Sequence, residues 1–360
     1  MIERLLFVDA AASVTEQSSS EIGKGTIDNF SITDDRGTVS KLSISPYFLH
    51  QIGNGLSSEL RYRYDDLEGD KGIVTNSTIQ SVALKMDSGN LAGRWQWSLN
   101  ARTSEVDYQS ESDQTHYSTD IGLSRHVFSR TIVSLHGGTE KVEYHPKTVG
   151  ETGGDYWMLG IDFQPGKRTS LSLTAGERYY GESFSLSLQH KARRAQLGLD
   201  YIEDLTNRSL VQLEQQFVQV GNTITLEEYP VLNTDVILRK TLSGHMEWHS
   251  AKSTISLRAS DTDYDYQTSD STERTQSTQA SWQWRTSQNM AFNLSGYYQH
   301  RKLSPSDTAE SISQVEMKLS RTIWPGASTS VSVASIDRDT DDSSQDYSQK
   351  RLTLAINMKW

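Results

Sequence analysis

Residues 351–360 read RLTLAINMKW, and this short stretch decides the class of fold. Apolar residues occupy every second position, namely Leu352, Leu354, Ile356, Met358 and Trp360. Successive side chains of a β-strand point to opposite faces, so the stretch predicts a strand with one apolar face. The strand ends the chain on an aromatic residue.

The same two-residue period continues upstream through much of the chain. It recurs in LSLTAG (171–176), SFSLSLQ (183–189), AQLGLDY (195–201), STISLRA (253–259) and QVEMKLS (314–320). No segment shows the three- to four-residue spacing of an amphipathic helix. The sequence therefore predicts an all-β protein.

Composition separates a membrane barrel from a soluble sheet protein. Only 35% of the 360 residues are hydrophobic, and counting Gly in place of Tyr raises this only to roughly 37%, whereas soluble domains contain about 45–50% apolar residues by that count. A transmembrane barrel needs only one apolar face per strand, because closure pairs the backbone groups and the lumen accepts polar side chains. We therefore predict a transmembrane antiparallel up-and-down β-barrel of the bacterial outer membrane, with residues 1–360 as one domain and 351–360 as its membrane-insertion strand.

Several other classes of protein are excluded by the same composition. No stretch approaches the ~20 apolar residues of a membrane helix, and a net charge of −11 without a basic stripe argues against nucleic-acid binding. The absence of cysteine excludes disulfides and thiol nucleophiles. The apolar run within residues 1–13 is shorter than the ~7–15 residues of a signal peptide, so we interpret the chain as a mature or truncated form of an exported protein.

Turn signals give the number of strands. Tight connections rich in Gly, Asn, Pro and Ser are predicted at 52–55, 87–90, 128–131, 165–168, 190–193, 250–252, 286–289 and 324–327. Longer acidic or Ser/Thr-rich connections lie between them, as expected for short periplasmic turns and longer extracellular loops. With two further strands at 208–217 and 223–229 the count is about twenty, and it is about eighteen if the first strand, near Leu5 to Thr15, lies outside the wall. The count of about twenty leaves both termini on the short-turn side, and an even number of strands is expected in either case.

Charged side chains alternate with the apolar ones and are predicted to line the lumen. These residues are Glu59, Arg61, Arg63, Arg94, Arg102, Asp162, Arg178, Asp200, Arg258, Arg285, Glu316 and Lys318. Charged walls tune solute passage, and a barrel of this size is wide enough for an aqueous lumen. The pattern favours a passive conduit without enzymatic activity. The alternatives are a structural or adhesive anchor with a plugged lumen and, third, an outer-membrane hydrolase, although no G-x-S-x-G motif occurs.

Three further groups of residues bear on ligands. His245, Glu247 and His249 share one predicted strand face, but neighbours on that face are ~6.6 Å apart, which is long for ligands of one ion. The acidic stretches 261–265 and 337–342 lack the Gly and Glu of a calcium loop and are predicted to be solvated loops near lipopolysaccharide. We therefore predict no metal and no cofactor.

The middle of the chain resembles a known family. The segment GIDFQPGKRTSLSLTAGERYYG (160–181), followed by SLSLQHKARRAQLGLDYIEDLT, resembles the exosortase/PEP-CTERM system-associated outer membrane proteins. The pieces VILRKTLSGHMEW (236–248) and DYSQKRLTLAINMKW (346–360) are also similar to it. The resemblance implies an outer-membrane barrel whose genes accompany exopolysaccharide production, and it supplies no catalytic residues. The partners expected on this basis are outer-membrane lipid and lipopolysaccharide, the barrel assembly machinery, polysaccharide and periplasmic export proteins.

Overall fold

The structure is a computed structural model in which a single curved β-sheet forms the molecule. The described residues are 5–18, 36–52, 55–70, 76–88, 94–109, 113–145, 152–206, 237–266, 271–304, 306–324, 326–341 and 346–358. All the secondary-structure elements in these ranges are strands. None of the described residues belongs to a helix long and apolar enough to cross a membrane.

The sheet contains 18 strands. They are β1 (Leu6–Ser18), β2 (Arg36–Ile52), β3 (Leu56–Gly69), β4 (Ser77–Asp87), β5 (Trp95–Tyr108), β6 (Asp113–Phe128), β7 (Thr131–His145), β8 (Thr152–Gly166), β9 (Thr169–Arg178), β10 (Gly181–Lys191), β11 (Ala195–Thr206), β12 (Ile237–His249), β13 (Ser253–Tyr266), β14 (Thr272–Ser287), β15 (Met290–Ser304), β16 (Thr308–Trp324), β17 (Ala327–Thr340) and β18 (Tyr347–Met358). The predicted all-β fold is confirmed.

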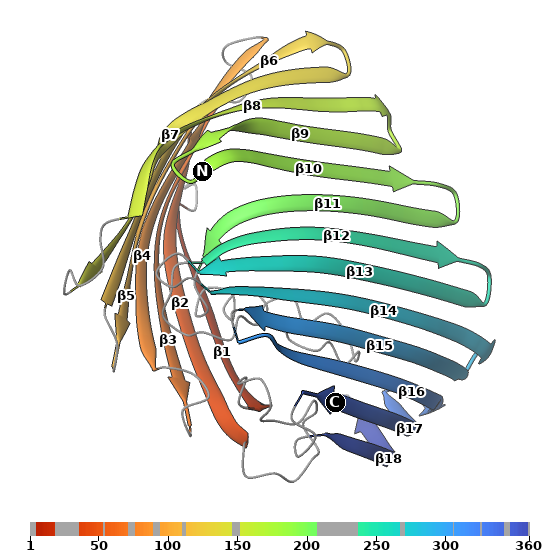
Figure 1. The fold of residues 1–360 in the computed structure, drawn as a ribbon. Coiled ribbons are helices and arrows are strands. Elements are labelled where there is room, and N and C mark those ends of the chain that lie inside the picture. The colour runs from red at the N-terminus through yellow and green to blue at the C-terminus, as the bar shows by residue number, and fades with distance from the viewer. Residues whose placement is uncertain are drawn as a thin grey trace.

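Each strand pairs antiparallel with the next strand along the chain, from β1–β2 to β17–β18. Figure 1 shows the strands following one another in sequence order around a strongly curved wall. Within the described residues β1 pairs with β2 and β18 pairs with β17, so these two strands are the edges of the sheet. This is the predicted up-and-down arrangement.

The count of eighteen corrects the larger prediction. β11 pairs directly with β12, from Ala195↔Trp248 to Thr206↔Ile237, so no further strands stand between them in the sheet. The strands predicted at 208–217 and 223–229 lie outside the described residues. The count of eighteen was predicted on the assumption that the first strand lies outside the wall, and this assumption is wrong. The first strand belongs to the wall, because Leu6 to Ser18 pair with Phe48 to Arg36.

The two rims of the wall differ, as predicted. All eight predicted tight connections follow even-numbered strands, from β2 to β16, and therefore lie on one rim, here the short-turn rim. Seven of them leave only two or three residues between the strands. The connection predicted at 87–90 is longer than predicted, because β4 ends at Asp87 and β5 begins at Trp95. The opposite, long-loop rim carries the connections that follow odd-numbered strands. Two of these connections are short: Tyr179 and Tyr180 alone join β9 to β10, and residues 305–307 join β15 to β16. β1 begins and β18 ends at the short-turn rim.

The outer face of the wall is apolar over its short-turn half. Leu352, Leu354 and Ile356 of β18 are 66%, 73% and 69% exposed, and the outward residues of the neighbouring strands are exposed in the same way. Met358 ends the strand, and Trp360 lies outside the described residues. Exposing so large an apolar surface to water would be unfavourable, so this belt is the lipid-facing surface.

The polarity of the two faces reverses in the long-loop half. In β5 the outward residues change from Trp95 and Trp97 to Glu105, while the inward residue Val106 is completely buried. Leu67, Ile79, Ile237 and Tyr266 are likewise inward and at most 4% exposed; this set lies close to the long-loop rim. Apolar contact therefore lies outside the wall in one half and inside it in the other.

This reversal overturns one prediction. The acidic stretch 261–265 is the outward edge of β13, and most of 337–342 belongs to β17, so neither is a loop. Polar residues on both sides of these segments conceal the strand period in the sequence, whereas the paired neighbours β12, β14, β16 and β18 fix it in the sheet.

Candidate functional site: the inner face of the wall

The inner face is defined by the residues that alternate with the lipid-facing belt. In β3, for example, Leu60 and Tyr62 face outward and are 49% and 38% exposed. Glu59, Arg61 and Arg63 occupy the positions between them and face the interior. The same alternation assigns an inner face to every strand.

Eleven of the twelve residues predicted to line the lumen lie on this inner face. They are Glu59, Arg61, Arg63, Arg102, Asp162, Arg178, Asp200, Arg258, Arg285, Glu316 and Lys318. Arg94 differs, because it immediately precedes β5 and belongs to the short-turn rim, where its carbonyl accepts a hydrogen bond from the His126 N–H. Arg94 therefore lies one residue before the start of β5, and the alternation of residues in the sequence did not show where that strand begins.

Some of these residues are brought together near the short-turn rim of β1 to β3. The Arg61 guanidinium contacts the carboxylates of Glu59 at 2.7 Å and Asp9 at 3.0 Å. It also lies over the ring of Tyr47, 3.8 Å from its centroid, and that ring stacks on Phe7 at 5.2 Å. Two aromatic rings framed by charged groups thus form a platform on the inner face.

Elsewhere in the short-turn half the predicted residues stay apart and are partly or fully exposed. Arg258 and Arg285 are exposed, and neither forms an ion pair within the described residues. Asp162 and Asp200 accept hydrogen bonds of 2.6 Å from Ser172 and Ser187. These side chains give a polar wall with open space beside it.

The long-loop half holds a set of ion pairs that the sequence did not reveal. The pair Arg301–Glu273 has an N–O distance of 3.1 Å, and its side chains are 12% and 0% exposed. The pair Arg338–Glu310 has the same distance, with exposures of 5% and 8%. The Tyr266 hydroxyl donates to Glu273 at 2.8 Å. Water is therefore excluded from the wall at this level.

The physical reason for missing these pairs is the reversal of polarity. Around Glu273 the sequence reads TERTQST, in which both faces of β14 are polar, so alternation gives no inner face. Pairing across strands supplies it, because Glu273 lies between Tyr264 and Leu303 in the sheet. Burial makes such pairs costly to break, since a lone charge would remain without water.

A buried hydroxyl marks the short turn between β9 and β10. Tyr179 and Tyr180 meet edge to face, with ring centroids 5.3 Å apart. Burial raises the pKa of the Tyr180 hydroxyl above its usual value, so the group stays protonated and donates to Ser183 Oγ at 3.3 Å. The ring contact and this hydrogen bond link the two tyrosines to each other and to β10 at the long-loop rim.

The residues considered for a metal do not assemble into a three-ligand group. His249 Nε2 lies 3.3 Å from a Glu247 carboxylate oxygen, and its Nδ1 lies 3.2 Å from Thr254 Oγ1. His245 occupies the space above Gly198 on the neighbouring strand, where any Cβ would clash with its ring. Among the described residues there is no group of three His, Asp or Glu that could hold a metal ion.

Comparison with known proteins gives matches of shape but not of sequence. No family model and no curated protein matches the chain. The FrpB iron transporter from Neisseria meningitidis matches with a TM-score of 0.58 and 10% identity, over 99% of this chain and 69% of its own. The siderophore receptor PirA from Acinetobacter baumannii gives 0.58 and 8% over the same shares, and the copper transporter OprC gives 0.51 and 10% over 98% and 67%.

At these identities the likeness concerns the fold. The chain has the fold of an outer-membrane β-barrel, with 18 antiparallel strands. That fold, together with the exposed apolar belt, places the chain in the bacterial outer membrane, because a β-sheet crosses lipid only as a barrel, in which neighbouring strands satisfy the backbone groups.

Proposed function

We propose that the chain is a passive conduit or export component of the outer membrane and that its cargo is an extracellular polysaccharide. The observation that carries the proposal is the inner face of the short-turn half, which is polar and open to water although the outer face at the same level is apolar. Exposed guanidinium groups such as Arg102, Arg258 and Arg285 lie on that face. A wall of this kind supports hydrated passage of a polar solute.

The chemistry of the lining supports a sugar as that solute. Sugar hydroxyls need donors and acceptors along the path, and the inner face supplies amide, hydroxyl, carboxylate and guanidinium groups. Sugar rings also stack on aromatic faces, for which the Phe7–Tyr47 platform stands at the short-turn side. The link to exopolysaccharide rests on the family resemblance of residues 160–181 and on this lining.

The matched folds support transport, and export and insertion would each need a partner. The matched barrels of known structure are transporters and receptors by name, which supports a transport role for this fold. Energy for export would come from periplasmic export proteins, since the sequence contains no phosphate-binding loop. Insertion would use the barrel assembly machinery, with β18 as the apolar terminal strand.

A second candidate is a structural or adhesive anchor whose interior is closed. The burial of the inner face in the long-loop half favours it, because Val106 and Ile237 are 0% exposed although they face the interior. A wall lined by open water at that level would leave such side chains accessible. In the conduit, the same layer is the constriction.

Single-channel recording in a planar bilayer separates the two candidates. The conduit gives steady conductance that oligosaccharides added from the short-turn side reduce. A protein that inserts, binds polysaccharide and stays silent is the anchor, and this result would remove the conduit.

A further inference from the structure

Basic side chains gather at the short-turn rim although the whole chain carries a net charge of −11. Arg94, Arg130, Arg168, Arg194 and Lys252 each stand immediately before an odd-numbered strand, from β5 to β13. All five are exposed. They belong to five consecutive hairpins and form what we call the basic rim.

The backbone holds these five residues at equivalent places. Each carbonyl accepts a hydrogen bond from an N–H of the next hairpin, at 2.7 to 3.2 Å, and the donors in order are His126, Gln164, Lys191, His249 and Arg285. Equivalent positions two strands apart are separated by about 10 Å along the rim, because adjacent strands are ~4.8 Å apart. The basic rim is therefore a regular row of cations, with a spacing close to the length of two linked sugar rings.

A cavity of about 350 Å³ lies on this row, between the β8–β9 and β10–β11 turns. Its cationic lining comprises Lys167, Arg168 and Lys191. Its amide lining comprises Gln164, Gln189 and Gln196. Amides and ammonium groups together suit a ligand that carries both hydroxyl and carboxylate oxygens.

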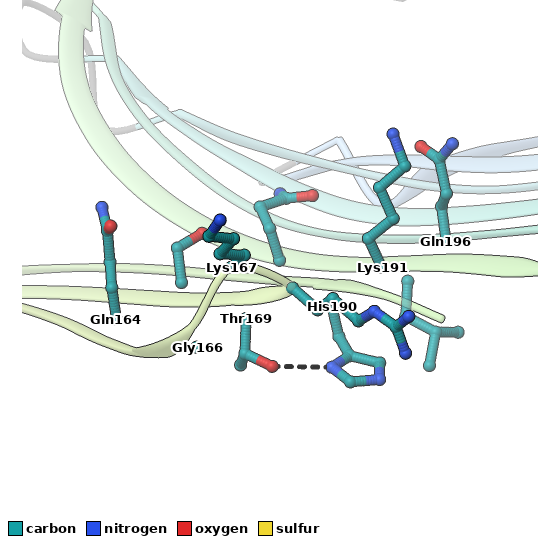
Figure 2. Close-up of a pocket in the computed structure, with 11 residues that line it drawn as sticks. Gln164, Gly166, Lys167, Thr169, His190, Lys191 and Gln196 are labelled. Atoms are coloured by element: carbon teal, nitrogen blue, oxygen red, sulfur yellow. Dashed lines mark hydrogen bonds between the residues drawn. The ribbon is translucent and has the colours of Figure 1, made fainter. Parts of the chain in front are cut away.

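The cavity is lined from both faces of the wall, and its amide groups and Lys191 lie on the inner face. Figure 2 shows Gln164, Lys191 and Gln196 projecting from one side of the ribbon, and His190 with Thr169 on the other side, joined at 2.8 Å. Gln196 shares the inner face with Asp200, and Lys191 shares it with Ser187. The cation and amide groups on the inner face are therefore accessible to material that enters the mouth of the barrel.

The described residues supply no carboxylate partner to the cations of the site. In the part of the chain that the structure describes, Lys167, Arg168, Lys191, Arg193 and Arg194 form no ion pair within 4.0 Å. The inner carboxylates closest along these strands, Asp162 and Asp200, already accept hydrogen bonds from serine hydroxyls. An anionic ligand could therefore form ion pairs with these cations without displacing a carboxylate of the described residues.

We propose that the basic rim and its amide-lined cavity bind a carboxylate-bearing, acidic polysaccharide at the periplasmic mouth of the barrel. The inference rests on the proposed conduit for its place in export and extends it by naming the class of substrate. Each exposed cation contributes little alone, but a chain of acidic sugars engages several at once, so binding grows with length and weakens with salt.

The test uses calorimetry to measure binding to the detergent-refolded protein. The ligands are an oligogalacturonate of about ten sugars and a neutral maltooligosaccharide of equal length. The variant Lys167→Gln/Arg168→Gln/Lys191→Gln removes the cavity's cations. The control Lys240→Gln/Lys302→Gln/Lys350→Gln removes the same charge from the outer face of the long-loop half. Heat-dependent gel mobility verifies that each variant is folded.

We expect the wild type to bind the oligogalacturonate in preference to the neutral chain, and less tightly as salt rises. The cavity variant should bind at least about tenfold more weakly, since three contacts are lost, while the control stays within about twofold. Equal loss in both variants, or no preference for the acidic chain, overturns the inference. So does binding that occurs only to vesicles containing phosphatidylglycerol, which would identify the rim as a lipid headgroup site.

Bilayer recording of the same proteins separates this inference from the proposed function. A conducting barrel that neutral and acidic chains block equally keeps the conduit and removes the acidic substrate. A silent barrel whose oligogalacturonate binding still depends on Lys167, Arg168 and Lys191 removes the conduit and keeps the acidic ligand.

Discussion

The two halves of strand β13 have opposite polarity on the same face. Near the short-turn rim its outward residues are Ile255 and Leu257, and the inward Arg258 is exposed. Near the long-loop rim its outward residues are aspartates, and the inward Tyr264 is 2% exposed. Lipid therefore covers only the short-turn half, and the long-loop half is a water-surrounded extension with its own packed interior.

The largest expected effect concerns the buried ion pairs of the long-loop half. Glu273→Gln leaves Arg301 buried without its partner carboxylate, 3.1 Å away in the wild type, and should lower the free energy of unfolding by about 3–5 kcal/mol. Glu316→Gln on the exposed half should cost less than about 1 kcal/mol. Urea titrations followed by tryptophan fluorescence give both values, and equal losses would remove the distinction between the halves.

The next effect concerns the outer face. Val333 and Asp337 both face outward on β17, four residues apart, in the lipid-covered and water-surrounded halves respectively. Val333→Lys should destabilise the refolded barrel by about 2–4 kcal/mol, because the charge enters hydrocarbon. Asp337→Lys should change the stability by no more than about 0.5 kcal/mol. If both variants refold equally well into lipid vesicles, the boundary of the belt is misplaced.

A third effect concerns the constriction. Tyr266→Ala removes a buried inward ring and its hydrogen bond to Glu273, so single-channel conductance should rise roughly twofold. The control Tyr298→Ala removes an outward ring that is 49% exposed and should leave conductance unchanged. A constriction elsewhere would be indicated if Tyr266→Ala conducted like the wild type.

The smallest effect concerns the exposed arginines of the short-turn half. Replacing Arg258 and Arg285 by Gln should move the reversal potential in a salt gradient toward cation preference, because two positive charges leave a hydrated wall. Stability should change by less than about 1 kcal/mol. Arg321→Gln, on the outer face, is the control, and an equal shift in it would show that the effect comes from net charge alone.

The strands of the lipid-covered half can be predicted from the sequence, because apolar residues that face lipid alternate there with polar residues that face the interior. That period gives the outward positions of Leu352, Leu354 and Ile356 and the inner positions of residues such as Arg102 and Arg258. Turn residues locate seven of the eight predicted tight turns. The other half is hidden, because both faces of a segment such as 272–278 are polar. Only cross-strand register shows that Glu273 and Arg301 share an interior.

The basic rim was hidden for a different reason. Arg130, Arg168 and Arg194 lie far apart in the sequence and look like ordinary turn residues of a chain with net charge −11. They become one feature because each precedes an odd-numbered strand and the hairpins stand side by side. The number of strands also depends on which strands lie side by side, because the direct pairing of β11 with β12 leaves no place for strands between them.

Single-channel recording of the refolded protein, with oligogalacturonate added to either side of the bilayer, tests the central claim most directly. We predict steady conductance that the acidic chain reduces more strongly from the short-turn side, where the basic rim stands. A barrel that inserts into the bilayer and carries no current would contradict the claim that this wall encloses a conduit.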